Sequence, residues 1–365
     1  MDIFEELGVK KYINAHDTYT IYGGSRMSAR TLKTMEEMAG AFVDMEELQR
    51  VLGDRTAGLT HNEGAYFTNG ASGGLLLAAC VCMTRGDLYH YRKLPDTEDI
   101  PNEILVMRAQ RNAYDKAIEA SGAQVAEIGD ADETLEFELE GRITSRTAGV
   151  FYFASALYQR GSLSLEKTIA AAHGKGVPVV VDAAAQLPPV ENLWKFTEMG
   201  ADMVIFSGGK TLCGPQDSGL ILGKREYIEI CRNIGSPGHG ICRSSKTSRE
   251  AMAGLYKAVE QYCSLNHREQ KEKMYQRNVS IQKKIEGRDS VLGTKITAKG
   301  PVGQEYPRLF CELKQIGKVE ETADKMREAG IYIGAVPEEN MIYISPLNLT
   351  DKEAEIVGDM LAEIL

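Results

Sequence analysis

The chain has 365 residues, of which 43% are hydrophobic and 26% are charged, so it can bury a substantial core. Its formal net charge is −10, which gives no support to nucleic-acid binding through a basic surface. The longest apolar run, residues 75–83, is too short to span a bilayer. These properties predict a globular protein of two or three domains without a membrane segment.

The first eleven residues carry acidic side chains where a secretory signal has a basic and an apolar region. Seven cysteines are scattered along the chain without a CxxC pair or the spacing of a zinc site. We therefore expect a cytoplasmic protein with reduced thiols and no metal site.

Short apolar runs alternate with helical patterns from residue 75 to about residue 222. Residues 75–83 predict a buried helix that follows a glycine cluster. The next expected strands are residues 103–107, 124–128, 149–154, 177–181, 203–206 and 219–222, with helices at 114–121, 164–173 and 191–199. This alternation is typical of right-handed βαβ crossovers and predicts an α/β fold with a mostly parallel sheet.

The pattern changes after about residue 240. Residues 247–287 predict one long polar-rich helix, which connects to a small α+β domain. In that domain we expect strands at 295–297, 307–313, 332–336 and 342–344, and helices at 319–329 and 351–365. The predicted organisation is an N-terminal arm (1–30), a large α/β domain (31–245), and a connector helix with a small C-terminal domain (246–365).

Two residues carry the chemistry that the sequence indicates. Asp182 ends the apolar run in PVVVDAAAQ, and Lys210 follows the next apolar run in ADMVIFSGGKTLCGPQ, 28 residues later. This spacing leaves room for one crossover helix. If the two strands are parallel neighbours, both side chains reach the carboxyl edge of the sheet, where open α/β sheets bind ligands.

An amine and a carboxylate that converge in a crevice suit pyridoxal 5′-phosphate (PLP). The amine forms an imine with the aldehyde, and the carboxylate keeps the pyridine nitrogen protonated so that the ring withdraws electrons. Taken singly, Lys210 could be a surface residue and Asp182 a helix N-cap. Their spacing at the ends of two apolar strands favours a cofactor site.

The segment FTNGASGGLLLAA runs from a short strand through a turn into a helix. Backbone N–H groups at such a helix start bind phosphate, and the helix dipole adds attraction. We expect Gly70, Ala71, Ser72 and Gly73 to hold the cofactor phosphate. Ser207, three residues before Lys210, is a further candidate phosphate ligand or a simple turn residue.

The segment RAQRNAYDKAI follows the strand at residues 103–107. A side chain at Gln110, Arg111 or Asn112 could cover one face of the pyridine ring. We choose Gln110, although stacking sites more often use aromatic or imidazole groups.

At these residues the sequence resembles fold-type-I PLP enzymes, and within them the selenocysteine synthase-like branch. That branch includes L-seryl-tRNA selenium transferase and D-glucosaminate-6-phosphate ammonia lyase. The motifs that carry the resemblance are collinear from residue 7 to about 260: LGVKKYINAHDTYTIYGGSRM, FTNGASGG, VVVDAAAQLPP, SGGKTLCGPQDSGLILGK and CRSSKTSREAMAGLYKAVE. The resemblance implies that Lys210 is the Schiff-base lysine and that Asp182 pairs with the pyridine nitrogen.

Basic residues near these motifs are candidate substrate ligands. Arg243 and Lys246 lie three apart, so they share one face if their segment opens a helix, and they could clamp an anionic substrate. Arg26 in GGSRM is a similar candidate, and His61 could act as an acid for a leaving hydroxyl. Each of the four could instead be an ordinary solvated or structural residue.

The resemblance implies a PLP-dependent lyase that acts on a small anionic amino acid such as D-glucosaminate 6-phosphate. Lys210 would take the Cα proton, the β-hydroxyl would leave, and hydrolysis would release ammonia and a 2-keto acid. The alternatives are another PLP reaction (transaminase, aldolase, racemase or β-replacement) and a tRNA-dependent transferase, which the acidic charge disfavours. Because active sites of this fold type form between subunits, the resemblance also implies at least a homodimer.

Overall fold

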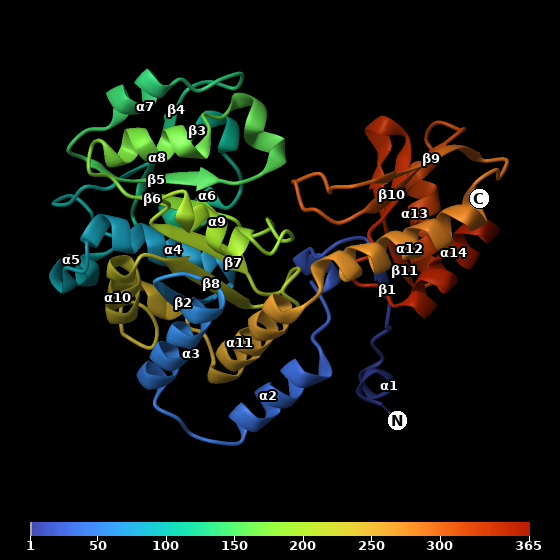
Figure 1. Cartoon of the computed structure of the whole chain (residues 1–365), viewed down its shortest axis with the longest axis horizontal. Coiled ribbons are helices and arrows are strands. Elements are labelled where there is room, and N and C mark those ends of the chain that lie inside the picture. The colour runs from blue at the N-terminus through green and yellow to red at the C-terminus, as the bar shows by residue number, and fades with distance from the viewer. Residues whose placement is uncertain (1) are drawn as a thin grey trace. The chain divides into compact units, whose positions relative to one another are not determined.

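The computed structural model describes residues 2–365, and a seven-stranded sheet lies at the centre of residues 27–264 (Figure 1). Its strands in spatial order are β2 (Gly64–Asn69), β8 (Ser218–Gly223), β7 (Met203–Ser207), β6 (Val179–Asp182), β5 (Thr147–Phe153), β3 (Glu103–Met107) and β4 (Gln124–Ile128). β8 is antiparallel to both of its neighbours, and the pairs from β7 to β4 are all parallel. The predicted α/β fold with a mostly parallel sheet is therefore confirmed.

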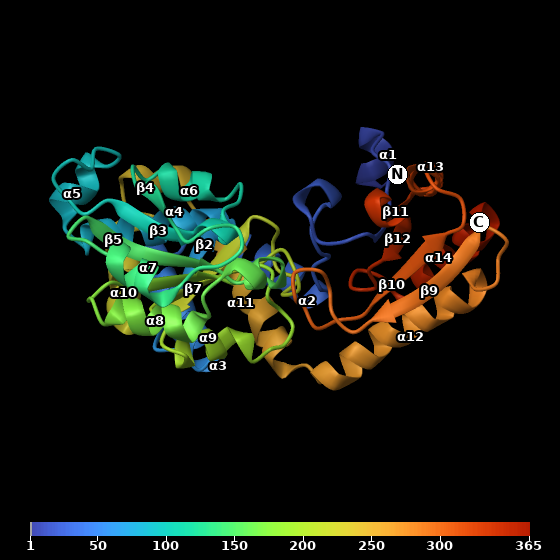
Figure 2. The same ribbon diagram turned by 90° about the horizontal axis from the view of Figure 1, so that it is seen from above.

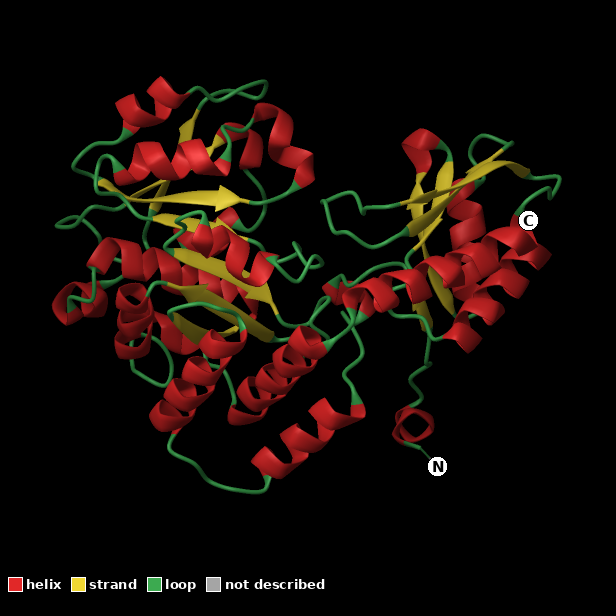
Figure 3. Ribbon diagram, in the orientation of Figure 1, coloured by secondary structure: helices red, strands yellow, loops and turns green. Residues whose placement is uncertain are grey.

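Helices cover both faces of this sheet (Figure 3). The α-helices are α2 (Ala29–Ala39), α3 (Met45–Leu59), α4 (Gly70–Thr84), α5 (Leu88–Lys93), α6 (Asp115–Glu119), α7 (Glu136–Arg142), α8 (Leu165–His173), α9 (Asn192–Glu198), α10 (Arg225–Ile234) and α11 (Arg249–Ser264). Three 3₁₀ turns are η2 (Arg108–Gln110), η3 (Ala156–Gly161) and η4 (Ile241–Ser245). Most of the crossovers thus contain the helices that parallel strands require.

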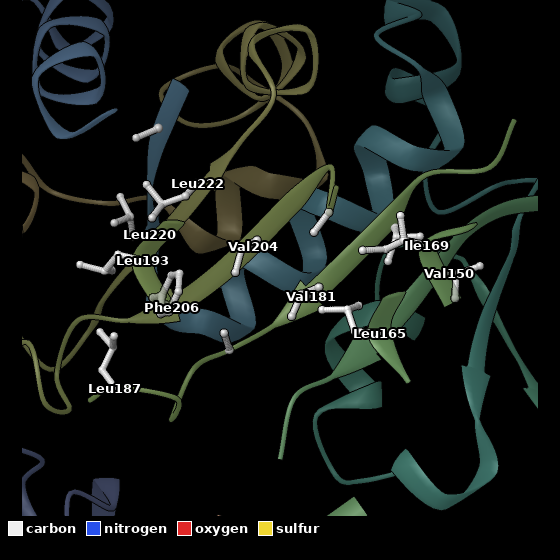
Figure 4. Close-up of a cluster of buried hydrophobic side chains, with 14 of the residues drawn as sticks. Val150, Leu165, Ile169, Val181, Leu187, Leu193, Val204, Phe206, Leu220 and Leu222 are labelled. Atoms are coloured by element: carbon white, nitrogen blue, oxygen red, sulfur yellow. The ribbon is translucent and has the colours of Figure 1, made fainter. Parts of the chain in front are cut away.

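Alternate side chains of the central strands enter two separate cores. Val204 and Phe206 of β7 pack in a cluster with Leu193 of α9 (Figure 4). Met203 and Ile205 of the same strand face the opposite cluster, which includes most of α4. This alternation is expected of a strand that is buried on both faces, and it explains the nearly continuous apolar runs in the sequence.

A second unit combines residues 2–26 with residues 265–365. Its five-stranded sheet has the order β1 (Ile13–Ala15), β11 (Ile331–Val336), β12 (Met341–Ile344), β10 (Arg308–Leu313) and β9 (Val291–Thr297). The helices α12 (His267–Ile285) and α14 (Asp351–Ile364) contact each other along it, as Figure 2 also shows. The remaining elements are α1 (Ile3–Leu7), α13 (Val319–Glu328), and the 3₁₀ turns η1 (Thr20–Tyr22) and η5 (Pro337–Glu339).

Two features of this unit differ from the sequence-based expectations. The single helix expected over residues 247–287 is wrong, because α11 ends at Ser264 and the side chain of Asn266 caps α12 by accepting the N–H of Glu269. The first 26 residues are not a separate arm, since β1 pairs in parallel with β11. The division of the chain therefore falls at residues 26 and 264 rather than at 30 and 245.

None of the helices within residues 2–365 combines the length and the apolar character that crossing a bilayer requires.

Candidate active site

Asp182 and Lys210 are carried to the same edge of the seven-stranded sheet. Asp182 is the last residue of β6, and Lys210 follows the end of β7 at Ser207 by three residues. The two strands are parallel neighbours, with Asp182 opposite Ile205. Because parallel strands end at a common edge, both residues lie at the carboxyl end of the sheet, where open α/β sheets bind ligands. The strand adjacency that the sequence argument requires is present.

The Asp182 carboxyl is half-buried, and burial raises its pKa above the ordinary value. Two interactions oppose this shift in the pKa: the N–H of Ala184 donates to Oδ1 at 2.9 Å, and the positive charge of Lys210 favours the ionised carboxylate. Lys210 is thus close enough to Asp182 to act on it electrostatically. No group among residues 2–365 donates a hydrogen bond to Asp182 Oδ2, which can therefore accept one from a ligand.

The backbone around Lys210 is held in a tight loop between β7 and β8. The N–H of Gly208 donates to the carbonyl of Ser218 at 2.8 Å. A Cβ on Gly208 would approach Ser218 Oγ to 2.1 Å, and one on Gly209 would approach Gln216 Cα to 2.4 Å. Only glycine fits at these two positions, so Gly208 and Gly209 hold the backbone that leads into Lys210 in place.

Helix α4 begins at this same edge. β8 lies between β2 and β7, and its first residues, Ser218 and Gly219, pair with Asn69 of β2 and Ser207 of β7. Because Asn69 directly precedes Gly70, the strand register brings the start of α4 to the edge that carries Asp182 and Lys210. Ser207 is half-buried at the end of β7 and lies on that edge as well.

The first turn of α4 offers an anion site from the predicted residues Gly70, Ala71, Ser72 and Gly73. The Asn69 side chain makes no capping hydrogen bond, so the N–H groups that begin the helix stay available. Apart from its chain neighbours and the backbone of the helix itself, nothing in the described chain lies within 4 Å of the position that a Cβ on Gly70 would take. Ser72 is exposed, so its hydroxyl is accessible beside this open space.

Ser245 adds a hydroxyl to this site that the sequence analysis does not identify. Its Cβ lies 3.4 Å from the position of a Cβ on Gly73, so the end of η4 packs against the first turn of α4. Its hydroxyl makes no hydrogen bond with any residue from 2 to 365. The two residues are far apart in the chain, and no spacing rule connects them.

Gln110 occupies a different place from the one predicted. Its Oε1 accepts the N–H of Phe153 at 2.8 Å, and its Nε2 donates to Ser162 Oγ at 3.0 Å. The residue is only 1% exposed. η2 turns the side chain back against β5, where it satisfies a strand amide, so no face of Gln110 is left to cover a ligand ring.

The two alternatives to Gln110 are also engaged. Arg111 forms ion pairs with Asp115 (2.5 Å) and Glu127 (2.6 Å). The side-chain amide of Asn112 donates to the backbone carbonyl of Gln110 at 2.9 Å. These contacts hold the turn after β3 and leave neither side chain free to stack.

Tyr158 is an aromatic residue of this edge that the sequence analysis misses. It lies in η3, five residues after the end of β5 at Phe153. Burial raises the pKa of its phenol first, and the nearby negative charge of Asp182 raises it further. Tyr158 is therefore within electrostatic range of Asp182 and follows β5, whereas Gln110 follows β3.

The structure places Arg26 in an ion pair. Its two terminal nitrogens bind the carboxylate of Glu353, at 2.8 and 2.7 Å, and one of them also binds the carbonyl of Asn348. Bidentate pairing of this kind occupies the guanidinium edge that a substrate anion would need. Arg26 thus fastens the N-terminal segment to α14, in contrast to the predicted substrate contact.

His61 lies at the opposite edge of the sheet from Asp182. It precedes β2, whose first residue, Gly64, is separated by five residues from Asn69 at the site edge, or about 17 Å along a strand. Its ring packs edge-on against Trp194 at 5.0 Å between centroids. Within this chain, β2 therefore separates His61 from Asp182 and Lys210, and its role as a proton donor stays a prediction.

Arg243 and Lys246 are exposed and form no ion pair within residues 2–365. Their segment does not open an α-helix, which was the condition for sharing one face, since η4 covers residues 241–245 and α11 starts only at Arg249. Both flank Ser245, which packs beside the first turn of α4. They therefore stay available to bind an anion near this turn.

These groups have the chemical character that the phosphate, the pyridine nitrogen and the aldehyde of PLP require. The open first turn of α4 suits a phosphate, the unpartnered Oδ2 of Asp182 suits a protonated pyridine nitrogen, and the amine of Lys210 lies within electrostatic range of that carboxylate.

Comparison with known proteins identifies the family. Residues 114–299 match the family described as L-seryl-tRNA selenium transferase. Over 266 residues the chain is 33% identical to D-glucosaminate-6-phosphate ammonia lyase of Salmonella typhimurium (strain 14028s / SGSC 2262), covering 72% of this chain and 70% of that protein. The chain belongs to the L-seryl-tRNA selenium transferase family.

Other members and structures define how far the similarity extends. The 5′-C-glycyluridine monooxygenase-decarboxylase of Streptomyces sp is 33% identical over 270 residues, covering 72% of this chain and 65% of that protein. A structure of D-glucosaminate-6-phosphate ammonia-lyase has a TM-score of 0.86 at 26% identity and covers 100% of this chain and 98% of its own. A structure of SPT with its PLP internal aldimine has a TM-score of 0.63 at 11% identity and shares the fold. The predicted fold type I of PLP enzymes is confirmed.

Proposed function

We propose that this protein is a PLP-dependent lyase that removes the β-hydroxyl of a phosphorylated amino acid such as D-glucosaminate 6-phosphate. The products are ammonia and a 2-keto acid. The observation that carries the proposal is the similarity to the ammonia-lyase structure, with a TM-score of 0.86 over 100% of this chain. The sequence identity of 33% to the Salmonella ammonia lyase supports the same conclusion.

The residues at the sheet edge would hold the cofactor at three points. The N–H groups from Gly70 to Gly73, with the hydroxyls of Ser72 and Ser245, bind its phosphate. Asp182 Oδ2 accepts a hydrogen bond from the pyridine nitrogen, and the carboxylate stabilises the proton there. Lys210 binds the aldehyde carbon through Nζ. Ser207 is a further phosphate ligand in this proposal.

PLP supplies an electron-withdrawing ring that stabilises negative charge at the substrate Cα. The chain's own part is to place a base and to keep the ring nitrogen protonated. Lys210 Nζ would be the base that takes the Cα proton of the bound substrate. Arg243 and Lys246, which lack ion pairs within the described chain, bind the substrate phosphate.

A second candidate reaction follows from the other relative. The glycyluridine monooxygenase-decarboxylase has the same identity, 33%, as the ammonia lyase. An oxidative decarboxylation of that type consumes oxygen and releases carbon dioxide, whereas the elimination needs no oxidant. Measurements of oxygen uptake and carbon dioxide release therefore distinguish the two reactions.

A tRNA-dependent transferase is disfavoured by the charge of −10, because binding of a polyanion requires a basic surface. We further propose that the protein forms at least a homodimer. The apolar side chain of Phe42, 97% exposed, and that of Leu32 on α2, 50% exposed, support a partner surface.

The proposal is tested by incubating the PLP-loaded protein with D-glucosaminate 6-phosphate and, as a comparison, with unphosphorylated D-glucosaminate. We expect ammonia and 2-keto acid in equal amounts, without oxygen uptake, and much faster from the phosphorylated compound. The Lys210→Ala variant should lose this turnover. Ammonia formation that requires oxygen, or no ammonia from any phosphorylated amino sugar acid, would reject the proposed reaction.

A further inference from the structure

Thr211, the residue after Lys210, connects the loop that carries the lysine with the loop that follows Asp182. Its Oγ1 donates a hydrogen bond of 2.9 Å to the backbone carbonyl of Leu187. Leu187 is 4% exposed and belongs to the core cluster drawn in Figure 4. The acceptor is therefore a fixed point of the core.

The sheet alone does not set the separation of the two site residues. The pairing of β6 with β7 reaches Asp182 and Ile205. Lys210 lies five residues beyond Ile205, in a loop that has left the sheet. The Gly208 N–H holds the start of this loop against β8, and Thr211 connects the loop at the residue after Lys210 with the loop that follows Asp182.

Burial and hydrogen bonds hold the residues on both sides of this contact in place. Leu212, next to Thr211, is 3% exposed in the same core cluster as Leu187. On the other side, the N–H of Ala184 binds Asp182 Oδ1, and the N–H of Gln186 donates to the carbonyl of Ala183 at 3.0 Å. A shift of Thr211 relative to Leu187 is thus passed on to Lys210 and Asp182.

We propose that Thr211 is a positioning residue whose hydroxyl, through the carbonyl of Leu187, holds Lys210 at a fixed separation from Asp182 so that both can bind one PLP molecule. This inference rests on the proposed PLP function. Thr211 itself touches neither the substrate nor the reacting atoms. It acts through the backbone of the lysine beside it.

The test compares Thr211→Val, which keeps the shape and removes the hydroxyl, with Thr211→Ser, which keeps the hydroxyl. Apoprotein is titrated with PLP to obtain Kd, and the visible band of the loaded protein is titrated with pH. Since the net worth of one hydrogen bond corresponds to a factor of about 3 to 10, we expect Thr211→Val to weaken PLP binding by about that factor. The pH midpoint of its visible band should move, and Thr211→Ser should retain both wild-type values.

A matched control is Thr97→Val. The Thr97 hydroxyl donates to the carbonyl of Gly122 at 3.1 Å, a comparable bond between loops at the opposite edge of the sheet. It should leave the PLP affinity and the pH midpoint unchanged. Thr211→Ala is the second hydroxyl-free variant if Thr211→Val does not fold.

Three outcomes would overturn the inference. If the hydroxyl-free variants keep the wild-type Kd and pH midpoint, Thr211 has no positioning role. The proposed PLP function would still stand in that case if Lys210→Ala abolishes the visible band. Thr211→Ser with the defect of Thr211→Val would show that packing and not the hydroxyl matters. A wild-type protein without any visible band in PLP would reject the proposed function and this inference with it.

Discussion

Asp182 shows how one residue meets two opposed physical demands. Its position at the end of β6 gives it a ligand-facing oxygen, yet burial there raises the pKa of its carboxyl and so disfavours the ionised form that a protonated pyridine needs. The Ala184 N–H and the charge of Lys210 reduce this cost without removing it. The ionised Asp182 carboxylate therefore lowers the stability of the apoprotein, although it is the form that pairs with a protonated pyridine nitrogen.

We predict that Asp182→Asn stabilises the apoprotein at pH 7 while it abolishes PLP binding. Because the folded-state pKa lies above the ordinary value of 3.8, the folded wild type holds this proton more tightly, and its stability falls as pH rises from about 3.8 through the folded pKa. The stability of Asp182→Asn does not fall in this way as the pH rises, because asparagine does not ionise. Its side-chain oxygen can still accept the hydrogen bond from the Ala184 N–H. Urea midpoints at pH 4 and pH 7 measure the effect. An advantage of the variant that does not grow with pH would contradict the account.

The sequence predicts the placement of Asp182, Lys210 and the start of α4 at one sheet edge, because each lies at or within three residues of the end of an apolar strand. Side chains that act through contacts between loops were not accessible in this way. The partners of Gln110, Phe153 and Ser162, are more than forty residues away in the chain, so no local pattern indicates that its side chain is engaged. Ser245 was missed for the same reason.

Helix α4 links the packing of the core to the phosphate site. It is buried along almost its whole length, and Gly74 lets it lie close to β7, since a Cβ there would come within 2.9 Å of Ile205 Cγ2. Isoleucine is branched at Cβ and has little freedom to move aside. The position of the helix start relative to Asp182 and Lys210 thus depends on this close approach.

We predict that Gly74→Ala lowers the free energy of unfolding by about 1–3 kcal/mol, the usual cost of overpacking a core. The neighbouring variant Gly73→Ala is the matched control. A Cβ there meets Ser245 at 3.4 Å, an ordinary contact, so we expect a change within about 0.5 kcal/mol. Urea unfolding of both variants measures the difference. Equal effects of the two substitutions would contradict the proposed packing.

Elements with strong apolar patterns were predictable, and their ends were less so. β3 and β4 have the predicted bounds: β3 consists of an apolar run after Glu103, and β4 begins two residues after Gly122, which has a positive φ. The break between α11 and α12 was missed, since Leu265 and Asn266 interrupt a polar-rich helical pattern by only two residues. The N-cap of Asn266 was a local indication of that break.

For the molecule as a whole, the main feature hidden from the sequence is that the first 26 residues fold with the last hundred. β1 supplies an edge strand beside β11, and Asp17 pairs with Arg308 at 2.7 Å. Arg308 is 0% exposed, and a buried guanidinium of this kind requires a charged partner. The members of this pair are 291 positions apart in the chain, so the pair leaves no periodic pattern in the sequence.

The central claim, that Lys210 is the residue that binds PLP, is tested most directly by trapping. The PLP-loaded protein is reduced with borohydride and digested, and the peptides are analysed by mass spectrometry. The account predicts a phosphopyridoxyl group on the peptide that contains Lys210, absent from Lys210→Ala and retained in Lys224→Ala, whose lysine pairs with Asp202 instead. Label on a different lysine, or no label, would contradict it.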